Sequence, residues 1–213
     1  MRTEKYQQDA KQILETDGAV GVNLGANTPI NSRKLRHMPR GSSVTINESV
    51  YHQMDELAKI SRTKQEEYSF FLFGEANGQE IFFDNIVAQG NEGNAAEAGF
   101  TQIAPILQNF VNEIQRENIK DQIVCHGHSH HISYFNGTGF SLGDMGAYME
   151  MNQENKVFKN KDIELCSCVL ENGDFNFLFY DNQTNNFYKF DDVRVKKENG
   201  QITKLPCYRE KDY

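Results

Sequence analysis

The sequence lacks the features that would place the protein at a membrane or on a nucleic acid. No apolar run approaches the roughly 20 residues of a membrane-spanning helix, and the N-terminal stretch MRTEKYQQDAKQ has no apolar core like that of a signal peptide. Acidic residues outnumber basic ones: the chain has 30 Asp and Glu and 22 Lys and Arg, which gives a formal net charge of −8. Because a phosphate-binding surface normally makes its domain basic, we expect a cytoplasmic protein with no membrane and no nucleic-acid partner.

Cysteine is also scarce, with four residues in a chain of 213. Cys166 and Cys168 stand two apart in a strand-like run and therefore share one face, as a metal-binding or redox-active pair would. No second cysteine pair or nearby histidine completes a tetrahedral set around them. We therefore expect buried, reduced thiols at these positions.

The chain is long and apolar enough for one well-buried core, with 38% hydrophobic and 11% aromatic residues. We expect an N-terminal helix and a linker or docking arm in residues 1–43, a catalytic domain in residues 44–195 and a tail in residues 196–213. Mixed strand and helix patterns predict an α/β or α+β layered domain that ends in an antiparallel meander. The expected strands are 44–46, 67–74, 80–88 and the run before His126, and the expected helices are 3–15, one capped by Asn47, one from about Thr101 and one from about Ser141.

Four of the six histidines lie within six residues, at the end of an apolar run. Alternate residues of a strand point the same way, so His126, His128 and His130 are expected on one face. Two histidines at positions i and i+2 can converge on one zinc ion at Zn–N distances of about 2.0–2.1 Å, and catalytic zinc takes three protein ligands and a water molecule. Asp144 is the nearest later carboxylate. The pattern therefore predicts a hydrolytic zinc site.

These residues resemble the signature of the JAMM metalloproteases, the zinc-bearing members of the MPN (JAB1/MPN/Mov34) domain family. That signature is a strand ending in HxHP, a loop and SxxD, with a glutamate on an upstream strand that usually reads ExxGxLxG. The matching segments here are VCHGHSHH, SLGD and EYSFFLFG, and the resemblance covers roughly residues 44–180. It implies an MPN-like (cytidine-deaminase-like) fold, in which a mixed central sheet is flanked by helices.

The resemblance implies one zinc ion per chain, held by His128, His130 and Asp144. A second register, in which His126 and His128 bind the metal, stays open because strand alternation puts both pairs on the same face. His131 stands in the place of the usual proline.

The resemblance also implies two catalytic residues. Glu67 would act as the general base on the zinc-activated water, and Ser141 would donate a hydrogen bond to the oxyanion. Glu66 is the competing carboxylate, and Ser141 could instead serve as a helix N-cap. Phe70 departs from the family, which often has glycine there, so the packing beside the site is expected to differ.

The function implied is cleavage of a peptide or isopeptide bond at the C-terminal tail of ubiquitin or a ubiquitin-like protein, which would be both substrate and partner. A dinuclear metallophosphoesterase is a competing interpretation, because CHGHSHH is similar to the late GH[ST]H motif of that class; no DxH, which that class also needs, precedes residue 126. A non-catalytic MPN scaffold or a relative of the RadC-type domain would also fit the pattern.

Overall fold

The computed structural model describes residues 2–16, 35–88, 108–110, 112, 122–131, 139–154, 163–171 and 173–206. Its labelled elements are α1 (Arg2–Thr16), β1 (Arg36–His37), β2 (Ser43–Asn47), α2 (Glu48–Lys64), β3 (Tyr68–Asn77), β4 (Glu80–Ala88), β5 (Gln122–Ser129), α4 (Leu142–Glu154), β6 (Ile163–Glu171), β7 (Asp174–Asp181), β8 (Asn186–Lys189), β9 (Val193–Lys196) and β10 (Ile202–Lys204).

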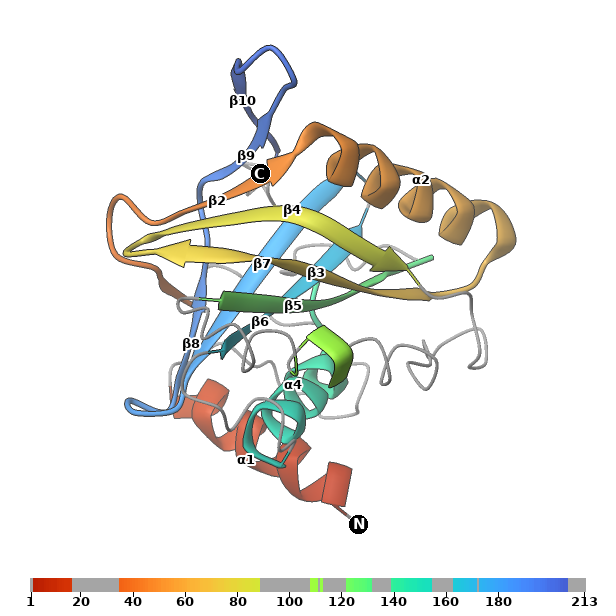
Figure 1. Cartoon of the computed structure of the whole chain (residues 1–213). Helices are drawn as coiled ribbons and strands as arrows, with labels where there is room; N and C mark the ends of the chain where they lie inside the picture. The colour runs from red at the N-terminus through yellow and green to blue at the C-terminus, as the bar shows by residue number, and fades with distance from the viewer. Residues whose placement is uncertain are drawn as a thin grey trace, which may run out of the picture.

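The ten strands form one mixed sheet in the order β1-β8-β7-β6-β5-β3-β4-β2-β9-β10. The sheet curls so strongly that strands far apart in this order meet across its concave side (Figure 1). Phe83 on β4 and Phe177 on β7 stack with ring centroids 6.0 Å apart, although three strands separate β4 from β7. The backbone N–H of Phe175 on β7 donates to the carbonyl of Pro206, just after β10, at 3.4 Å. The sheet is therefore a half-barrel.

The expected fold class, an MPN-like central sheet flanked by helices with a separate C-terminal meander, was wrong. Strands dominate the described residues, and the C-terminal strands belong to the single curled sheet. Strands β6, β7 and β8 form an antiparallel meander, but β9 leaves it and pairs in parallel with β2, where Val44 lies opposite Val193. The local sequence pattern could not predict this pairing, because it joins segments about 150 residues apart.

The sheet buries an apolar cluster on each face. Helix α2 packs on the concave face through Val50, Met54 and Ala58. Helices α1 and α4 pack against the other face, where they join side chains from β3, β5, β6, β7 and β8 (Figure 1). The face that carries α4 is the one on which the histidines of β5 lie.

Helix α1 is built into the fold through close contact with α4. Tyr6 and Ala10 are buried, at 3% and 0% exposure. A Cβ atom at Gly146 of α4 would lie 2.9 Å from the backbone nitrogen of Gln7, so only glycine permits this approach of the two helices. The expected N-terminal helix therefore exists and fixes the position of α4.

Several expected elements match in position, and others lie outside the described residues. Asn47 occupies the N-cap of α2 but makes no side-chain capping bond, and a left-handed Gln65 ends that helix. Most of the helix expected from Thr101 and most of the loop between His131 and Phe140 are not described.

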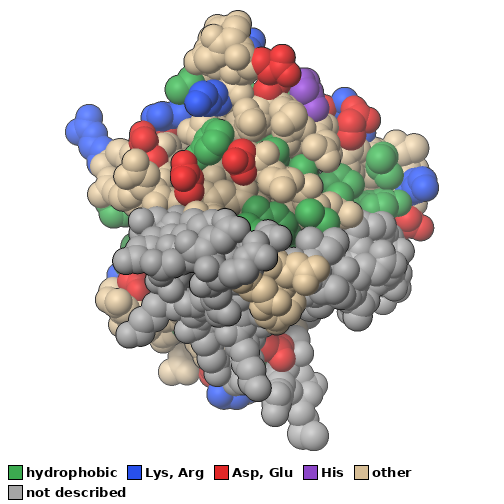
Figure 2. Space-filling model, in the orientation of Figure 1, with side chains coloured by type: hydrophobic (Ala, Val, Ile, Leu, Met, Phe, Trp, Pro, Cys, Tyr) green, Lys and Arg blue, Asp and Glu red, His purple; other side chains and the backbone are tan. Residues whose placement is uncertain are grey.

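Acidic and basic side chains are interspersed over the described part of the face in Figure 2. A nucleic-acid-binding face normally gathers its basic residues in a patch or stripe. The expected absence of a nucleic-acid partner remains a prediction.

Gly127, between two histidines of β5, accommodates an aromatic ring from the neighbouring strand. Phe70 on β3 lies opposite it in register, and its ring occupies the space that a side chain at position 127 would need. A Cβ atom at Gly127 would lie 2.2 Å from two ring carbons, and Phe70 is fully buried. Phe70 and Gly127 are thus complementary in size across the strand pair.

We expect Gly127→Ala to lower the free energy of unfolding by about 1–3 kcal/mol, because overpacking a filled core has this cost. Urea denaturation monitored by circular dichroism would measure it. The double variant Phe70→Leu/Gly127→Ala should lose less than the sum of the two single changes, since the smaller side chain makes room for the methyl group. Strict additivity would contradict the proposed contact.

Candidate metal centre

Strand pairing brings the candidate residues to one end of the sheet. In β5, His126 and His128 alternate with residues of the concave core, and His130 follows directly after the strand. Tyr68 of β3 lies opposite Ser129, so one step further along this antiparallel pair Glu67 comes opposite His130. The three histidines and Glu67 therefore lie on the face that α4 covers.

The same alternation separates Glu67 from Glu66. Glu67 is buried, at 7% exposure, with a carboxylate oxygen 4.0 Å from Nε2 of His130. Glu66 accepts a hydrogen bond from the Tyr68 hydroxyl at 2.9 Å, and its backbone carbonyl accepts one from Ser61. Of the two neighbouring glutamates, Glu67 is the one beside the histidines.

Glu67, His128 and His130 form a buried group that could hold a metal ion, because their ligand atoms all lie within 4.8 Å of one another. The Nε2 atoms of the two histidines are 2.9 Å apart. At this distance at most one of them carries a proton, so at least one lone pair faces the other ring. Two imidazoles and a carboxylate are common ligands of zinc and other transition metals.

Asp144 also lies close to the two imidazoles. Its Oδ1 is 3.2 Å from Nε2 of His128, and its Oδ2 is 3.7 Å from Nε2 of His130. The structure thus brings together every site residue expected from the sequence, with two carboxylates, Glu67 and Asp144, available as the third ligand.

Ser141 and Asp144 hold each other at the start of α4. The backbone N–H and the hydroxyl of Ser141 donate to Oδ2 of Asp144 at 2.7 and 2.8 Å, and the backbone N–H of Asp144 donates to the Ser141 hydroxyl at 3.2 Å. This is the reciprocal arrangement of a capping box. Burial alone would raise the pKa of Asp144, but His128, His130 and the Ser141 N–H together lower it, so the carboxylate is ionised at neutral pH.

His126 lies deeper along the strand and outside the three-residue group. Its ring packs against Phe71 at a centroid distance of 5.2 Å. Burial, aided by repulsion from His128, lowers the pKa of His126 to about 3 against an opposing attraction from Asp144. The imidazole is therefore neutral at physiological pH.

His131 turns toward the base candidate. Its Nδ1 atom is buried and makes no hydrogen bond, and it lies 3.9 Å from Oε1 of Glu67. Position 131 thus places an imidazole beside Glu67.

The sequence did not reveal Glu171, at the end of β6, as a residue of the site. It is 7% exposed, and its Oε2 lies 3.5 Å from Nδ1 of His130. The available signal was its position as the first residue of the predicted turn ENGD, directly after a strand-like run, but that signal does not reveal which strand lies beside β6.

The three cysteines within the described residues lie on the opposite face of the sheet from the histidines of β5. Cys125, Cys166 and Cys168 are free, fully buried members of the concave core. Burial raises the pKa values of the Cys125 and Cys168 thiols, which keeps them protonated and unreactive.

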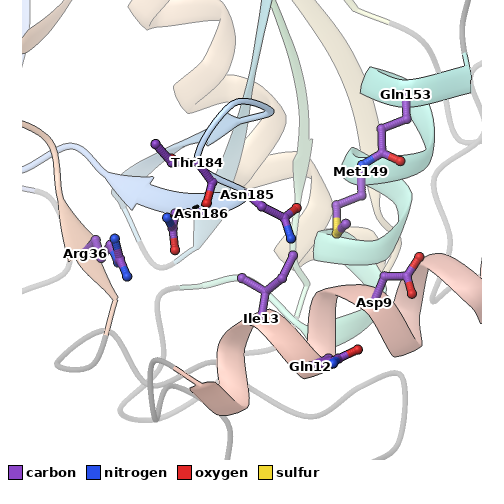
Figure 3. Close-up of a pocket in the computed structure, with 9 residues that line it drawn as sticks. All are labelled: Asp9, Gln12, Ile13, Arg36, Met149, Gln153, Thr184, Asn185 and Asn186. Carbon is purple, nitrogen blue, oxygen red and sulfur yellow. Dashed lines mark hydrogen bonds between the residues drawn. The ribbon is translucent and has the colours of Figure 1, made fainter.

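A separate pocket of about 470 Å³ lies between α1, α4 and the turn that joins β7 to β8 (Figure 3). Polar side chains such as Asp9, Gln153 and Asn185 line much of it, and Arg36 is the one cationic residue among the described residues of its lining. None of the described residues that line it is a histidine or cysteine. The pocket and the candidate metal centre are therefore distinct features of the molecule.

Comparisons with known proteins assign no family. No family model and no curated protein matches the chain. The solution structure of protein DSY2949 from Desulfitobacterium hafniense is similar at 14% identity, covering 73% of this chain and 94% of that one with a TM-score of 0.43. At this level the similarity assigns neither fold nor function. Among the described residues, no helix has the length and apolar character to span a membrane.

The low pKa of His126 predicts an acid sensitivity of the metal-free fold. An unfolded histidine has a pKa of about 6.5, whereas the pKa of folded His126 is about 3. Between these two pH values, His126 binds a proton in the unfolded chain but not in the folded protein. The contribution of neutral His126 to the free energy of unfolding is therefore fully present above pH 6.5. It is lost as the pH falls towards 3, by up to about 1.4 kcal/mol per pH unit.

Denaturation of protein treated with a chelator, from pH 7 to pH 4, would measure this. His126→Asn should flatten the acid loss of stability, whereas His52→Asn on the exposed side of α2 should not. Equal pH dependence in wild type and His126→Asn would contradict the assignment of a buried, neutral imidazole.

Proposed function

We propose that this protein is a zinc-dependent hydrolase with the residue set of the JAMM peptidases. It would cleave a peptide or isopeptide bond at the C-terminal tail of a ubiquitin-like protein. The observation that carries the proposal is the buried group of Glu67, His128 and His130 with Asp144 beside it. Two carboxylates converge here on two imidazoles, and a bound cation would compensate the carboxylate charge that this buried site gathers.

The donor set favours zinc. Two histidines and one carboxylate are the ligands of a well-known class of catalytic zinc sites, which leave one position open. Zinc in such a site acts as a Lewis acid and lowers the pKa of a water molecule that it binds to about 7. We assign His128, His130 and Asp144 as the ligands.

Glu67 is then the general base. Its carboxylate lies close to the ligand imidazoles, with Oε1 4.0 Å from Nε2 of His130. It would accept the proton of the attacking water and pass it to the departing amine, a role that typically contributes 10²–10⁴-fold.

Ser141 would stabilise the oxyanion of the tetrahedral intermediate. Its hydroxyl has one proton, which points to Asp144 in this structure. The backbone N–H of Ser141 donates a second hydrogen bond to the same carboxylate oxygen of Asp144, at 2.7 Å. The hydroxyl can therefore turn to the substrate while Asp144 keeps a hydrogen bond and its position.

The substrate class rests on the family resemblance. Tails of ubiquitin-like proteins are extended and end in glycine, so their terminal carbonyl can approach a centre that a compact domain cannot enter, and strand addition is a common way to bind such segments. The cytoplasm is the expected location, and the three free, buried cysteines agree with a reducing compartment.

Two substitutions test whether Asp144 is the metal ligand and Glu67 the general base. Asp144→Asn should lower the zinc content of purified protein, because the amide is a poor ligand. Glu67→Gln should keep one zinc per chain but reduce turnover by at least 100-fold. Metal analysis by plasma mass spectrometry gives the stoichiometry. Loss of zinc in Glu67→Gln with retention in Asp144→Asn would exchange the two roles, and two metals per chain would favour a phosphoesterase.

A second prediction concerns the substrate. Wild-type protein should cleave ubiquitin dimers or ubiquitin-like fusions in a way that depends on Glu67 and is abolished by chelators. Glu66→Gln is the matched control and should cleave normally. Glu67-dependent cleavage of a phosphodiester reporter, with all protein substrates intact, would refute the proposal. Zinc binding with no hydrolysis of either kind would indicate a non-catalytic scaffold.

A further inference from the structure

Glu171 is a buried carboxylate that the proposed reaction does not use. It ends β6, which runs parallel to β5 with His128 opposite Val169. Two residues further along, Glu171 comes beside His130, and the backbone N–H of His130 donates to the carbonyl of Leu170 at 2.9 Å. Glu171 is 7% exposed. Such a buried charge needs a compensating partner.

The partner is the ring nitrogen of His130 that faces away from the candidate metal centre. Oε2 of Glu171 lies 3.5 Å from Nδ1 of His130, whereas Nε2 of the same ring points to His128, Asp144 and Glu67. A neutral imidazole carries one proton, and an ionised carboxylate can only accept a hydrogen bond. A carboxylate beside Nδ1 therefore favours the tautomer with the proton on Nδ1 and the lone pair on Nε2.

The geometry points to Glu171 as a positioning residue, which fixes the tautomer and ring orientation of His130 so that Nε2 is ready to bind the metal. This inference rests on the proposed metal centre. Carboxylates that hydrogen-bond to the second nitrogen of a ligand histidine orient it and raise its basicity, and their loss typically lowers metal affinity 10–100-fold.

Close packing keeps Glu171 in place. A Cβ atom at Gly139, just before α4, would lie 3.4 Å from Oε2 of Glu171 and 3.0 Å from the amide nitrogen of Asn176. Gly139 has a φ of +79°, which favours glycine in this turn. The turn that leads to Ser141 therefore lies close to the carboxylate and leaves no free space for a side chain at position 139.

The two ligand histidines are held differently. His128 lies in register between Ser69 of β3 and Val169 of β6, neither of which is ionisable. Its Nε2 approaches Asp144. Loss of Glu171 should therefore disturb His130 and leave His128 in place.

The test is zinc affinity, measured by competition with a chromogenic chelator, together with the absorption spectrum of the cobalt-substituted protein. We expect Glu171→Ala to bind zinc 10–100-fold more weakly and to alter the cobalt bands. Glu171→Gln keeps a hydrogen-bond acceptor without the charge, so it should fall between Glu171→Ala and wild type. Glu164→Ala, an exposed position on the same strand, is the matched control and should match wild type.

The outcomes separate this inference from the proposed function. If wild type binds zinc and both Glu171 variants match it in affinity and cobalt spectrum, Glu171 does not position His130, while the metal centre stands. If wild type binds neither zinc nor cobalt, the metal centre and this inference both fail. Circular dichroism of the metal-free variants reports whether they are folded, and Glu171→Gln, which keeps the volume of the side chain, serves if Glu171→Ala is not.

Discussion

The candidate site depends on the hydrogen-bonded ladder that holds β5 between β3 and β6. This ladder sets Glu67, His130 and Glu171 side by side at the ends of the three strands. Strand β5 pairs antiparallel with β3 and parallel with β6. Because side chains alternate between faces, a slip of one residue in either pairing would send one of these carboxylates to the opposite face. Register, more than any single contact, determines whether the polar groups meet.

Asp144 comes to the site from helix α4, whose position is fixed by two separate contacts. The capping box between Ser141 and Asp144 sets the first turn of α4. Two residues further, Gly146 lets α1 lie directly on α4. An N-terminal segment that looks mostly polar in the sequence therefore supports the position of Asp144.

Local patterns predicted the features that depend on local geometry. Strand alternation predicted that three histidines share one face. Together with the family resemblance it favoured Glu67 over Glu66, and Asp144 was chosen from the resemblance and as the nearest later carboxylate. The same patterns do not reveal which strands are neighbours. For this reason Glu171, which reaches His130 only because β6 pairs with β5, was missed. The fold class was wrong for the same reason: the parallel pairing of β9 with β2 and the curl of the sheet depend on contacts between distant segments.

The contact between Phe70 and Gly127 constrains how this sequence can have arisen. The ring fills the space that any larger residue at position 127 would need. An ancestor with a side chain at position 127 therefore had to lose it before a phenylalanine could be accepted at position 70. The reverse order would pass through an intermediate with a clash between two strands of the candidate site. Among homologues, the two positions should covary, and reversion at either one should be blocked while the other is unchanged.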